Sequence, residues 1–344
     1  MRAVVIHAAK DLRIDTLPDA APAAGQVRVR TERGGICGSD LHYFHDGRIG
    51  TIVLREPMVL GHEVSGVVNA IGPGVTRVRA GDRIAVNPSL ACGRCRYCQE
   101  GKQMHCLDMR FYGSAMRIPH VQGAFRETLV VEEAQCHVVP AAISAGEAAM
   151  CEPFAVCLHA VRRAGPLLGK RVLVTGCGPI GVLCVVAARQ AGALEVVVTD
   201  VTDTPFATAK SMGASRCVNV AASADALRQF AADKGTFDVL LECSGNEKAL
   251  VGAFEALKPQ GIIVQVGLGG SFTLPINVLV AKEFDLRGTF RFHEEFALAA
   301  DLISDRRVDV RPLITATLPF ADAREAFVLA SDRSKSMKVQ LAFG

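Results

Sequence analysis

The stretch from residue 170 to residue 200 constrains the fold of this chain more than any other part of its sequence. It begins with an apolar strand pattern, Lys170–Thr175, and continues as Gly176-Cys177-Gly178-Pro179-Ile180-Gly181, a Gly-x-Gly-x-x-Gly turn. The apolar residues of Ile180–Ala191 predict a helix, and Glu195–Thr199 predicts a second strand that leads into Asp200. Glycines in such a turn let a pyrophosphate approach the N–H groups at the beginning of the helix. The pattern therefore predicts a dinucleotide-binding site.

The residues expected to bind the cofactor lie in this turn and at strand ends. They are Gly176, Gly178, Pro179, Ile180, Gly181, Asp200, Val266 and Gly267. Asp200 can accept hydrogen bonds from both ribose hydroxyls, and its charge would repel a 2′-phosphate. Because no basic residue lies between Val201 and Pro205, we expect NAD rather than NADP. The alternative is a chance glycine-rich turn with Asp200 as a solvated strand end, but strand, turn, helix and acid follow here in the order that a cofactor site needs.

Further strand patterns after Asp200 indicate the architecture around this turn. Asp238–Glu242 and Gly261–Val266 are nearly continuous apolar runs, and helical patterns separate them. Strands that alternate with helices predict an α/β fold with a doubly wound parallel sheet, covered on both faces. We expect this cofactor domain to span residues 153–289.

The remainder of the chain predicts a second, mainly β domain. Short strand patterns such as Val27–Arg30 and Val64–Val68 are broken by Gly, Pro and Asp turns, as in a partly open barrel. A helix is expected around Glu294–Ser304 and a closing strand over Lys338–Phe343. We expect this domain to combine residues 1–152 and 290–344.

Composition excludes several classes of function. A chain of 344 residues that is 50% hydrophobic suits two domains with proper cores. The 38 basic and 35 acidic residues nearly balance, and no long basic run points to nucleic acid. No apolar stretch approaches the roughly 18 to 20 residues of a membrane span, and the N-terminus lacks the pattern of a signal peptide. We therefore expect a cytoplasmic protein, in which the 12 cysteines are ligands or buried thiols rather than disulfides.

Four of the cysteines crowd into a lobe at about residues 90–108. Cys92, Cys95, Cys98 and Cys106 provide four thiolates, enough to close a tetrahedral shell, which predicts a structural zinc. An iron–sulfur cluster is one alternative, but the last gap is seven residues and no Pro follows Cys106. A zinc module that binds nucleic acid is another, but it would need a basic face around it.

A second possible metal site combines residues that are far apart in sequence. Cys37 and the pair His62-Glu63 lie in glycine-flanked loops, where backbone can approach a metal closely. Glu152 adds a carboxylate at the expected domain boundary, and Cys151 beside it is a competing ligand. A shell of Cys, His and one carboxylate leaves a position open, which a catalytic zinc requires.

These features, in this order, resemble the zinc-containing medium-chain dehydrogenases, the family of alcohol, sorbitol and threonine dehydrogenases. The likeness covers the Cys37 loop, Gly61-His62-Glu63, the four-cysteine lobe, Glu152-Pro153 and the glycine turn. The resemblance implies a GroES-like catalytic domain, a Rossmann cofactor domain, two zinc ions per chain and a homotetramer. One departure is Pro205-Phe206, because the family often has there an Arg that stacks on adenine.

The resemblance also implies roles for individual residues. Cys37 and His62 would bind the catalytic zinc, and Glu63 or Glu152 would complete its shell, directly or through water. Zinc would stabilise the deprotonated substrate hydroxyl, and Ser39, the cofactor ribose and His42 would carry the proton away. Ser39 as a turn hydroxyl and His42 as a surface imidazole are the simpler alternatives.

Within the family, several segments resemble the members that oxidise L-idonate to 5-keto-D-gluconate. These segments are Arg33–Cys37, Asp108–Met116, Pro119–Val121 and Leu286–Phe292. Since idonate carries a carboxylate, a cation is expected in its pocket, with Arg110 and Arg291 as candidates and Tyr43 as a further substrate contact. Arg291 as a partner of Glu152, and Arg110 as a loop charge, are the alternatives. An alternative within the same family is a polyol dehydrogenase that acts on sorbitol or xylitol. An alternative of another class is a non-catalytic redox sensor, but such a protein would lack metal ligands that this chain has.

Overall fold

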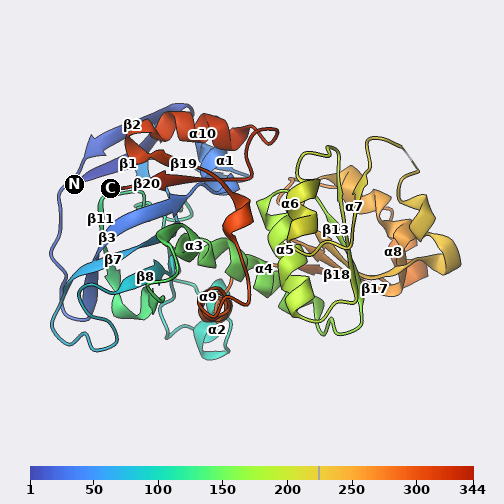
Figure 1. The fold of residues 1–344 in the computed structure, drawn as a ribbon, viewed down its shortest axis with the longest axis horizontal. Helices are drawn as coiled ribbons and strands as arrows, with labels where there is room; N and C mark the ends of the chain where they lie inside the picture. The colour runs from blue at the N-terminus through green and yellow to red at the C-terminus, as the bar shows by residue number, and fades with distance from the viewer. Residues whose placement is uncertain (224) are drawn as a thin grey trace. The chain divides into compact units, whose positions relative to one another are not determined.

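Two compact units make up the computed structural model, which describes residues 1–223 and 225–344 (Figure 1). One unit combines Met1–Glu152 with Phe296–Gly344, and the other is Pro153–Glu295. The chain thus returns to the first unit at Phe296, later than the expected residue 290. The physical reason is Glu295, whose carboxylate accepts hydrogen bonds from His159 and Arg162 of the second unit.

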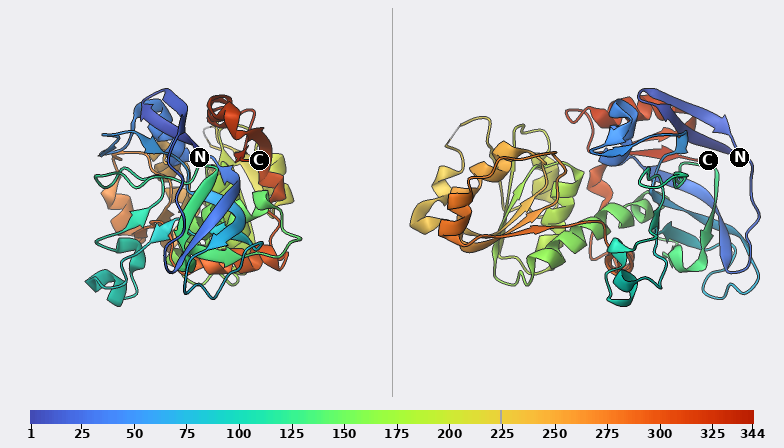
Figure 2. Two further views of the ribbon diagram at one scale, coloured as in Figure 1. Left: turned by 90° about the vertical axis from the view of Figure 1, so that its left-hand side faces the viewer. Right: turned by 180° about the vertical axis from the view of Figure 1, so that it is seen from behind.

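The first unit is mainly β. A seven-stranded sheet has the order β12-β8-β7-β3-β20-β19, with β11 also paired to β3, and all its pairs are antiparallel except β19 with β20. A three-stranded sheet has the order β2-β1-β6, and both chain termini lie in this unit (Figure 2). The strands are β1 (Arg2–Ala8), β2 (Asp11–Thr16), β3 (Gln26–Gly35), β4 (Arg48–Ile49), β5 (Ile52–Val53), β6 (Met58–Val59), β7 (Glu63–Ile71), β8 (Arg83–Val86), β9 (Ser89–Leu90), β10 (Arg110–Phe111), β11 (Thr128–Glu132), β12 (Cys136–Val138), β19 (Ile314–Pro319) and β20 (Lys338–Ala342).

Helices of this part of the chain are short. They are α1 (Gly38–Asp46), α2 (Arg96–Gln99), α3 (Ala145–Ala149), α9 (Glu295–Ser304) and α10 (Ala323–Ser331), and α4 (Cys151–Ala164) continues into the second unit. Burial alternates along β11, so that Leu129 and Val131 enter the core and the residues between and beside them are partly exposed. The core of this unit also contains Phe125, Phe327 and Leu341.

The second unit has a six-stranded parallel sheet of order β15-β14-β13-β16-β17-β18. Helices α5 and α6 lie on one face of the sheet, and α7 and α8 lie on the other (Figures 1 and 2). The strands are β13 (Arg171–Thr175), β14 (Glu195–Asp200), β15 (Arg216–Asn219), β16 (Phe237–Glu242), β17 (Leu257–Gln265) and β18 (Asp285–Gly288). The helices are α5 (Pro179–Gln190), α6 (Phe206–Ser211), α7 (Glu247–Gly252) and α8 (Ile276–Lys282).

Burial explains why the central elements of this sheet were predictable. Val172, Leu173 and Val174 of β13 are fully buried, as expected for a strand covered on both faces. The start of one strand differs from the prediction: β17 begins at Leu257 rather than at Gly261. It pairs with β16 through a register shift. Among the described residues, no helix is both long and apolar enough to span a membrane.

Candidate metal and cofactor sites

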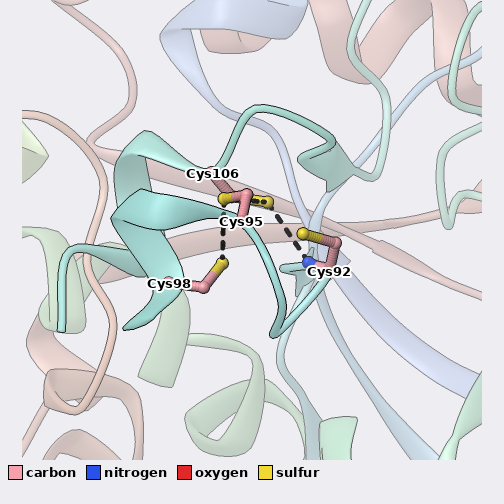
Figure 3. A group of neighbouring side chains, drawn as sticks. All are labelled: Cys92, Cys95, Cys98 and Cys106. Atoms are coloured by element: carbon pink, nitrogen blue, oxygen red, sulfur yellow. Dashed lines mark hydrogen bonds between the residues drawn. The ribbon is translucent and has the colours of Figure 1, made fainter. Parts of the chain in front are cut away.

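The four-cysteine lobe brings its sulfur atoms together. The Sγ atoms of Cys92, Cys95, Cys98 and Cys106 all lie within 4.8 Å of one another and face the same space (Figure 3). Cys95 Sγ is 3.5 Å from Cys98 Sγ and 3.9 Å from Cys106 Sγ. A tetrahedral zinc with bonds of about 2.3 Å requires sulfur atoms about 3.8 Å apart. The lobe therefore fits a zinc with four protein ligands.

Backbone N–H groups around the lobe favour thiolates. Those of Cys92 and Asp108 donate to Cys106 Sγ at 3.2 and 3.3 Å. Hydrogen bonds from the N–H groups of Leu107 and Cys98 lower the pKa of Cys95 to about 6. Burial raises the pKa of Cys98 to about 12, a direction that a bound cation reverses. The thiolate is the form that binds metals, so the loop is organised for a cation.

The second candidate metal site lies in the first unit. Single ligand atoms of Cys37, His62 and Glu63 lie within 4.8 Å of one another. His62 Nδ1 is buried and has no hydrogen-bond partner among the described residues. Burial, and then the charge of Glu63, raise the pKa of Cys37 to about 11, a direction that a bound cation reverses. This donor set and the unsatisfied imidazole fit a zinc ion.

A single carboxylate connects the two loops that carry Cys37 and His62. Asp40, fully buried in α1, accepts from the Cys37 N–H at 3.0 Å and from the Gly61 N–H at 3.1 Å. Its Oδ1 also lies 3.8 Å from His62 Nδ1. Gly61 has φ +90°, and a Cβ there would lie 2.1 Å from the Phe125 ring, so only glycine suits this close turn.

Glu63 forms a buried ion pair. Lys338 Nζ of β20 lies 2.7 and 2.8 Å from the two carboxylate oxygens, and it also donates to the Ile36 carbonyl at 3.2 Å. Both side chains are almost completely buried. The lysine therefore neutralises Glu63 at the edge of the candidate zinc site.

Glu152 is buried but is not part of the group formed by Cys37, His62 and Glu63. Burial raises its pKa to about 8, while His62 acts in the opposite direction. Burial also raises the pKa of the neighbouring Cys151 to about 12, which favours an inert thiol there.

The predicted proton-transfer and substrate residues of α1 differ in their environments. Ser39 Oγ lies 3.5 Å from His62 Nε2, next to the candidate ligands. The His42 side chain is half exposed, 3.7 Å from Asp46. Tyr43 is only 2% exposed, and its hydroxyl accepts a hydrogen bond from the Ala115 N–H. Tyr43 is thus a core residue of the first unit as well as a predicted substrate contact.

The glycine turn connects β13 to α5, as predicted. Gly176 has φ +86°, and a Cβ on Gly181 would lie 1.8 Å from the Gly176 carbonyl oxygen, so the turn requires glycine at both positions. Asp200, at the end of β14, accepts from the Cys177 N–H at 2.7 Å and from the Val201 N–H at 2.8 Å. The acid therefore also holds the turn itself.

The other predicted cofactor residues follow β17. The N–H groups of Val266 and Gly267 both donate to the Glu242 carbonyl at 2.8 Å. Phe206, in the segment where the family resemblance led us to expect an Arg, is a buried residue at the beginning of α6.

The two candidate substrate arginines occupy different units. Arg110 is exposed in β10 of the first unit. Arg291, in the second unit, is half-buried and has φ +54°, with its guanidinium 4.9 Å from the centroid of the Phe290 ring. A left-handed conformation costs a non-glycine residue about 1 kcal/mol or more, and such residues concentrate at functional sites.

The sequence-based predictions gave no role to Asp40, Lys338 or Glu242. One feature of the sequence pointed to a role for Asp40: it is the N3 residue of a capping box at the beginning of α1. Lys338 also had such a feature, because it is a charged residue at the beginning of a closing strand whose other residues are apolar except Gln340. Their partners are too distant in sequence to be inferred from these features.

Comparisons with known proteins identify the family of this chain. Residues 23–141 match the family described as Alcohol dehydrogenase GroES-like domain, and residues 179–305 match the family described as Zinc-binding dehydrogenase. The chain belongs to the zinc-binding medium-chain dehydrogenases, whose GroES-like and Rossmann-like domains correspond to the two units.

Individual members of this class are similar to the chain over most of its length. The chain is 43% identical over 316 residues to L-idonate 5-dehydrogenase (NAD(P)(+)) of Escherichia coli strain K12, covering 92% of this chain and 91% of that protein. It is 35% identical to sorbitol dehydrogenase of Gallus gallus, over 98% of this chain and 95% of the relative. The crystal structure of L-idonate 5-dehydrogenase from Escherichia coli matches with a TM-score of 0.95 and 40% identity, covering 99% of this chain and 97% of that one.

Proposed function

We propose that this protein oxidises the 5-hydroxyl of L-idonate, producing 5-keto-D-gluconate, NADH and a proton. The observation that carries the proposal is the 43% identity to the Escherichia coli L-idonate enzyme, together with a Cys37, His62 and Glu63 group suited to an open zinc site. A polyol dehydrogenase is the second candidate, favoured by the 35% identity to a sorbitol dehydrogenase.

In this mechanism Cys37, His62 and a carboxylate hold zinc, which supplies the Lewis acidity that lowers the pKa of a substrate hydroxyl. Glu63, which belongs to the group and is also paired with Lys338, or the buried Glu152 completes the shell, directly or through water. Ser39, beside His62, accepts the hydroxyl proton, and the half-exposed His42 passes it to solvent. Bound NAD would supply the hydride acceptor, and the glycine turn and Asp200 would hold it.

A spectrophotometric screen tests the substrate. L-idonate, gluconate, sorbitol, xylitol and threonine are each offered with NAD and with NADP, and NADH or NADPH formation is followed. We expect the highest kcat/KM for L-idonate with NAD. A higher value for sorbitol or xylitol would replace this proposal with the polyol dehydrogenase.

We propose that an arginine, Arg291 or Arg110, binds the substrate carboxylate. For the half-buried Arg291, losing a charge-assisted pair with the carboxylate should cost about 2 to 5 kcal/mol, or on the order of 30-fold to several thousand-fold in kcat/KM. For the exposed Arg110 the loss should be smaller. Arg291→Ala and Arg110→Ala are each assayed with L-idonate and with sorbitol, which has no carboxylate. A loss confined to idonate identifies the partner.

Arg291→Gly provides the matched control, because glycine adopts positive φ without strain. The same selective loss in Arg291→Gly and Arg291→Ala would assign the effect to the guanidinium rather than to the backbone. Equal losses on both substrates would instead assign Arg291 to the zinc site or to the fold.

We propose that Asp200 selects NAD over NADP through the ribose hydroxyls. Asp200→Asn retains a side-chain acceptor for the Cys177 N–H but removes the charge. Since hydrogen bonds to a charged group contribute about 1.5 to 3 kcal/mol, NAD should bind about 10- to 100-fold more weakly. NADP should be affected much less, as measured by KM for each cofactor. Equal losses for both would show that Asp200 is not the discriminating residue.

We further propose that the enzyme is a cytoplasmic homotetramer that acts on a small hydroxy acid or polyol. This proposal is supported by the family resemblance and by a near-neutral composition without a long basic run. Light scattering coupled to size-exclusion chromatography measures the assembly directly.

A further inference from the structure

We propose that Glu242 is a positioning residue that holds the loops of the dinucleotide cradle in place. Glu242 is the last residue of β16 and is completely buried. Thr175 of β13 and Gln265 of β17 are its partners in the parallel register on either side. The three residues form a row at the carboxyl end of the sheet, where ligands of such sheets bind.

Hydrogen-bond donors from all three strand ends converge on the Glu242 carboxylate. Oε1 accepts from Thr175 Oγ1 at 3.3 Å, from the Ser244 N–H at 2.9 Å and from the Ser244 hydroxyl. Oε2 accepts from Gln265 Nε2 at 2.6 Å and from the Gly245 N–H at 3.0 Å. The two carboxylate oxygens offer about four lone-pair sites, so one side chain accepts from donors of all three strand ends.

The backbone of Glu242 adds to this network. Its carbonyl oxygen accepts from the N–H groups of Val266 and Gly267, both at 2.8 Å. One residue therefore contacts the end of the strand before the glycine turn, the loop after β16 and the loop after β17.

The loops are in such close contact that a shift of one must move the others. A Cβ on Gly176 would lie 2.8 Å from the Ser244 nitrogen, and a Cβ on Gly267 would lie 2.2 Å from the Gly245 nitrogen. The glycine turn thus rests directly on the Ser244–Gly245 loop that Glu242 holds. Because a pyrophosphate is bound by N–H groups at fixed positions, a displacement of this loop weakens cofactor binding.

Core packing alone does not explain a carboxylate at this position. Burying one costs free energy unless hydrogen bonds compensate it, whereas an apolar residue would complete the strand without that cost. We infer that the carboxylate is there to hold the donors of the three strand ends in a defined arrangement.

The test compares two variants at opposite ends of the same strand. Glu242→Gln keeps the size of the side chain but places an NH₂ group where acceptors for Gly245 and Gln265 are needed. Asp238→Asn is the control: Asp238 accepts from the Arg171 N–H at 2.8 Å and from Lys258 at 3.0 Å at the other end of the sheet. Both variants should have a lower Tm.

Only Glu242→Gln should raise the Kd for NADH, measured by isothermal titration calorimetry on the full-length protein. Loss of a hydrogen bond to a charged group predicts an increase of about 10- to 100-fold. KM for NAD should rise with it, while kcat at saturating NAD changes little. This readout uses the cofactor alone and is independent of the substrate assignment.

If Glu242→Gln does not fold, Thr175→Val provides a second test of the same network. It removes one neutral donor from the row, so the Kd for NADH should rise by about 2- to 10-fold. A Kd equal to that of the wild type in every folded variant of this row, with a fall in Tm like that of Asp238→Asn, would overturn the proposal.

Discussion

At the scale of single residues, the candidate zinc site depends on buried charges whose partners come from other strands. Glu63 begins β7, and its partner Lys338 begins β20, on the other side of the central strand β3. A Cβ on Gly35 of β3 would lie 2.1 Å from the Glu63 carboxylate, so the ion pair crosses a glycine. Glycine at this position therefore makes room for the charge.

Replacing Lys338 tests this pair. Lys338→Met leaves the Glu63 carboxylate buried and unpaired, and breaking a buried pair in this way costs about 3 to 5 kcal/mol. Urea denaturation of the zinc-loaded protein should show this loss in the free energy of unfolding.

The double variant Lys338→Met with Glu63→Gln is the control, and it should recover most of the stability because it removes the orphan charge. A single variant as stable as the wild type would mean that Glu63 has another partner in solution.

At the scale of elements, Glu295 joins the beginning of α9 to α4. Its carboxylate accepts from His159 Nδ1 at 3.1 Å, from Arg162 Nη1 at 2.9 Å and from the His293 N–H at 2.9 Å. Burial alone would raise the pKa of Glu295, but these hydrogen bonds together hold it well below its ordinary value. The same contacts restrain the segment that follows Arg291. Arg291 has a positive φ, and a residue in this conformation persists only where the surrounding structure holds it.

The lowered pKa predicts a pH-dependent contribution to stability. A depressed carboxyl pKa stabilises the folded protein above the ordinary value of 4.5 and loses this effect as pH falls through the folded value. Glu295→Gln should therefore lower the free energy of unfolding at pH 7, and the difference from the wild type should shrink as the pH falls well below 4.5.

Glu294→Gln is the matched control, because the exposed Glu294 side chain bonds the same Arg162 at 3.2 Å. Exposed pairs contribute about 1 kcal/mol or less, so this variant should resemble the wild type at every pH. A difference for Glu295→Gln that does not change with pH would assign the effect to packing.

At the scale of the whole molecule, the candidate metal ligands and the candidate cofactor residues lie in different units. The Cys37–His62–Glu63 group and the four-cysteine lobe belong to the first unit, and the glycine turn with Asp200 belongs to the second. Each unit has its own hydrophobic core. Cofactor binding and metal binding should therefore be separable by experiment.

Metal removal tests this separation and the proposed zinc content. The protein should contain two zinc ions per chain by mass spectrometry, and a chelator should first remove the one at the open site. Oxidation of substrate should stop while the Kd for NADH stays unchanged, and added zinc should restore activity. Cys95→Ser should lose the lobe zinc and some stability. One metal per chain, or iron, would contradict the two-zinc proposal.

Much of the fold and the site follows from local sequence. The glycine turn, the apolar strand before it and Asp200 are close in sequence, and backbone sterics allow few other conformations for them. The spacing of Cys92, Cys95 and Cys98 likewise keeps their thiolates near one another. Such features are predictable because the physical constraint acts within a few turns of the chain.

Other features were decided only by the tertiary structure. Lys338 meets Glu63 across 275 residues of sequence, and Glu242 meets Thr175 across 67. The return of the chain at Phe296 rather than at residue 290 similarly depends on the contact of Glu295 with His159. Lys338 and Glu242 are buried charges at the ends of largely apolar strands, and buried charges require a partner. Which partner each of them meets is set by strand order and register, which place distant residues in one row of the sheet.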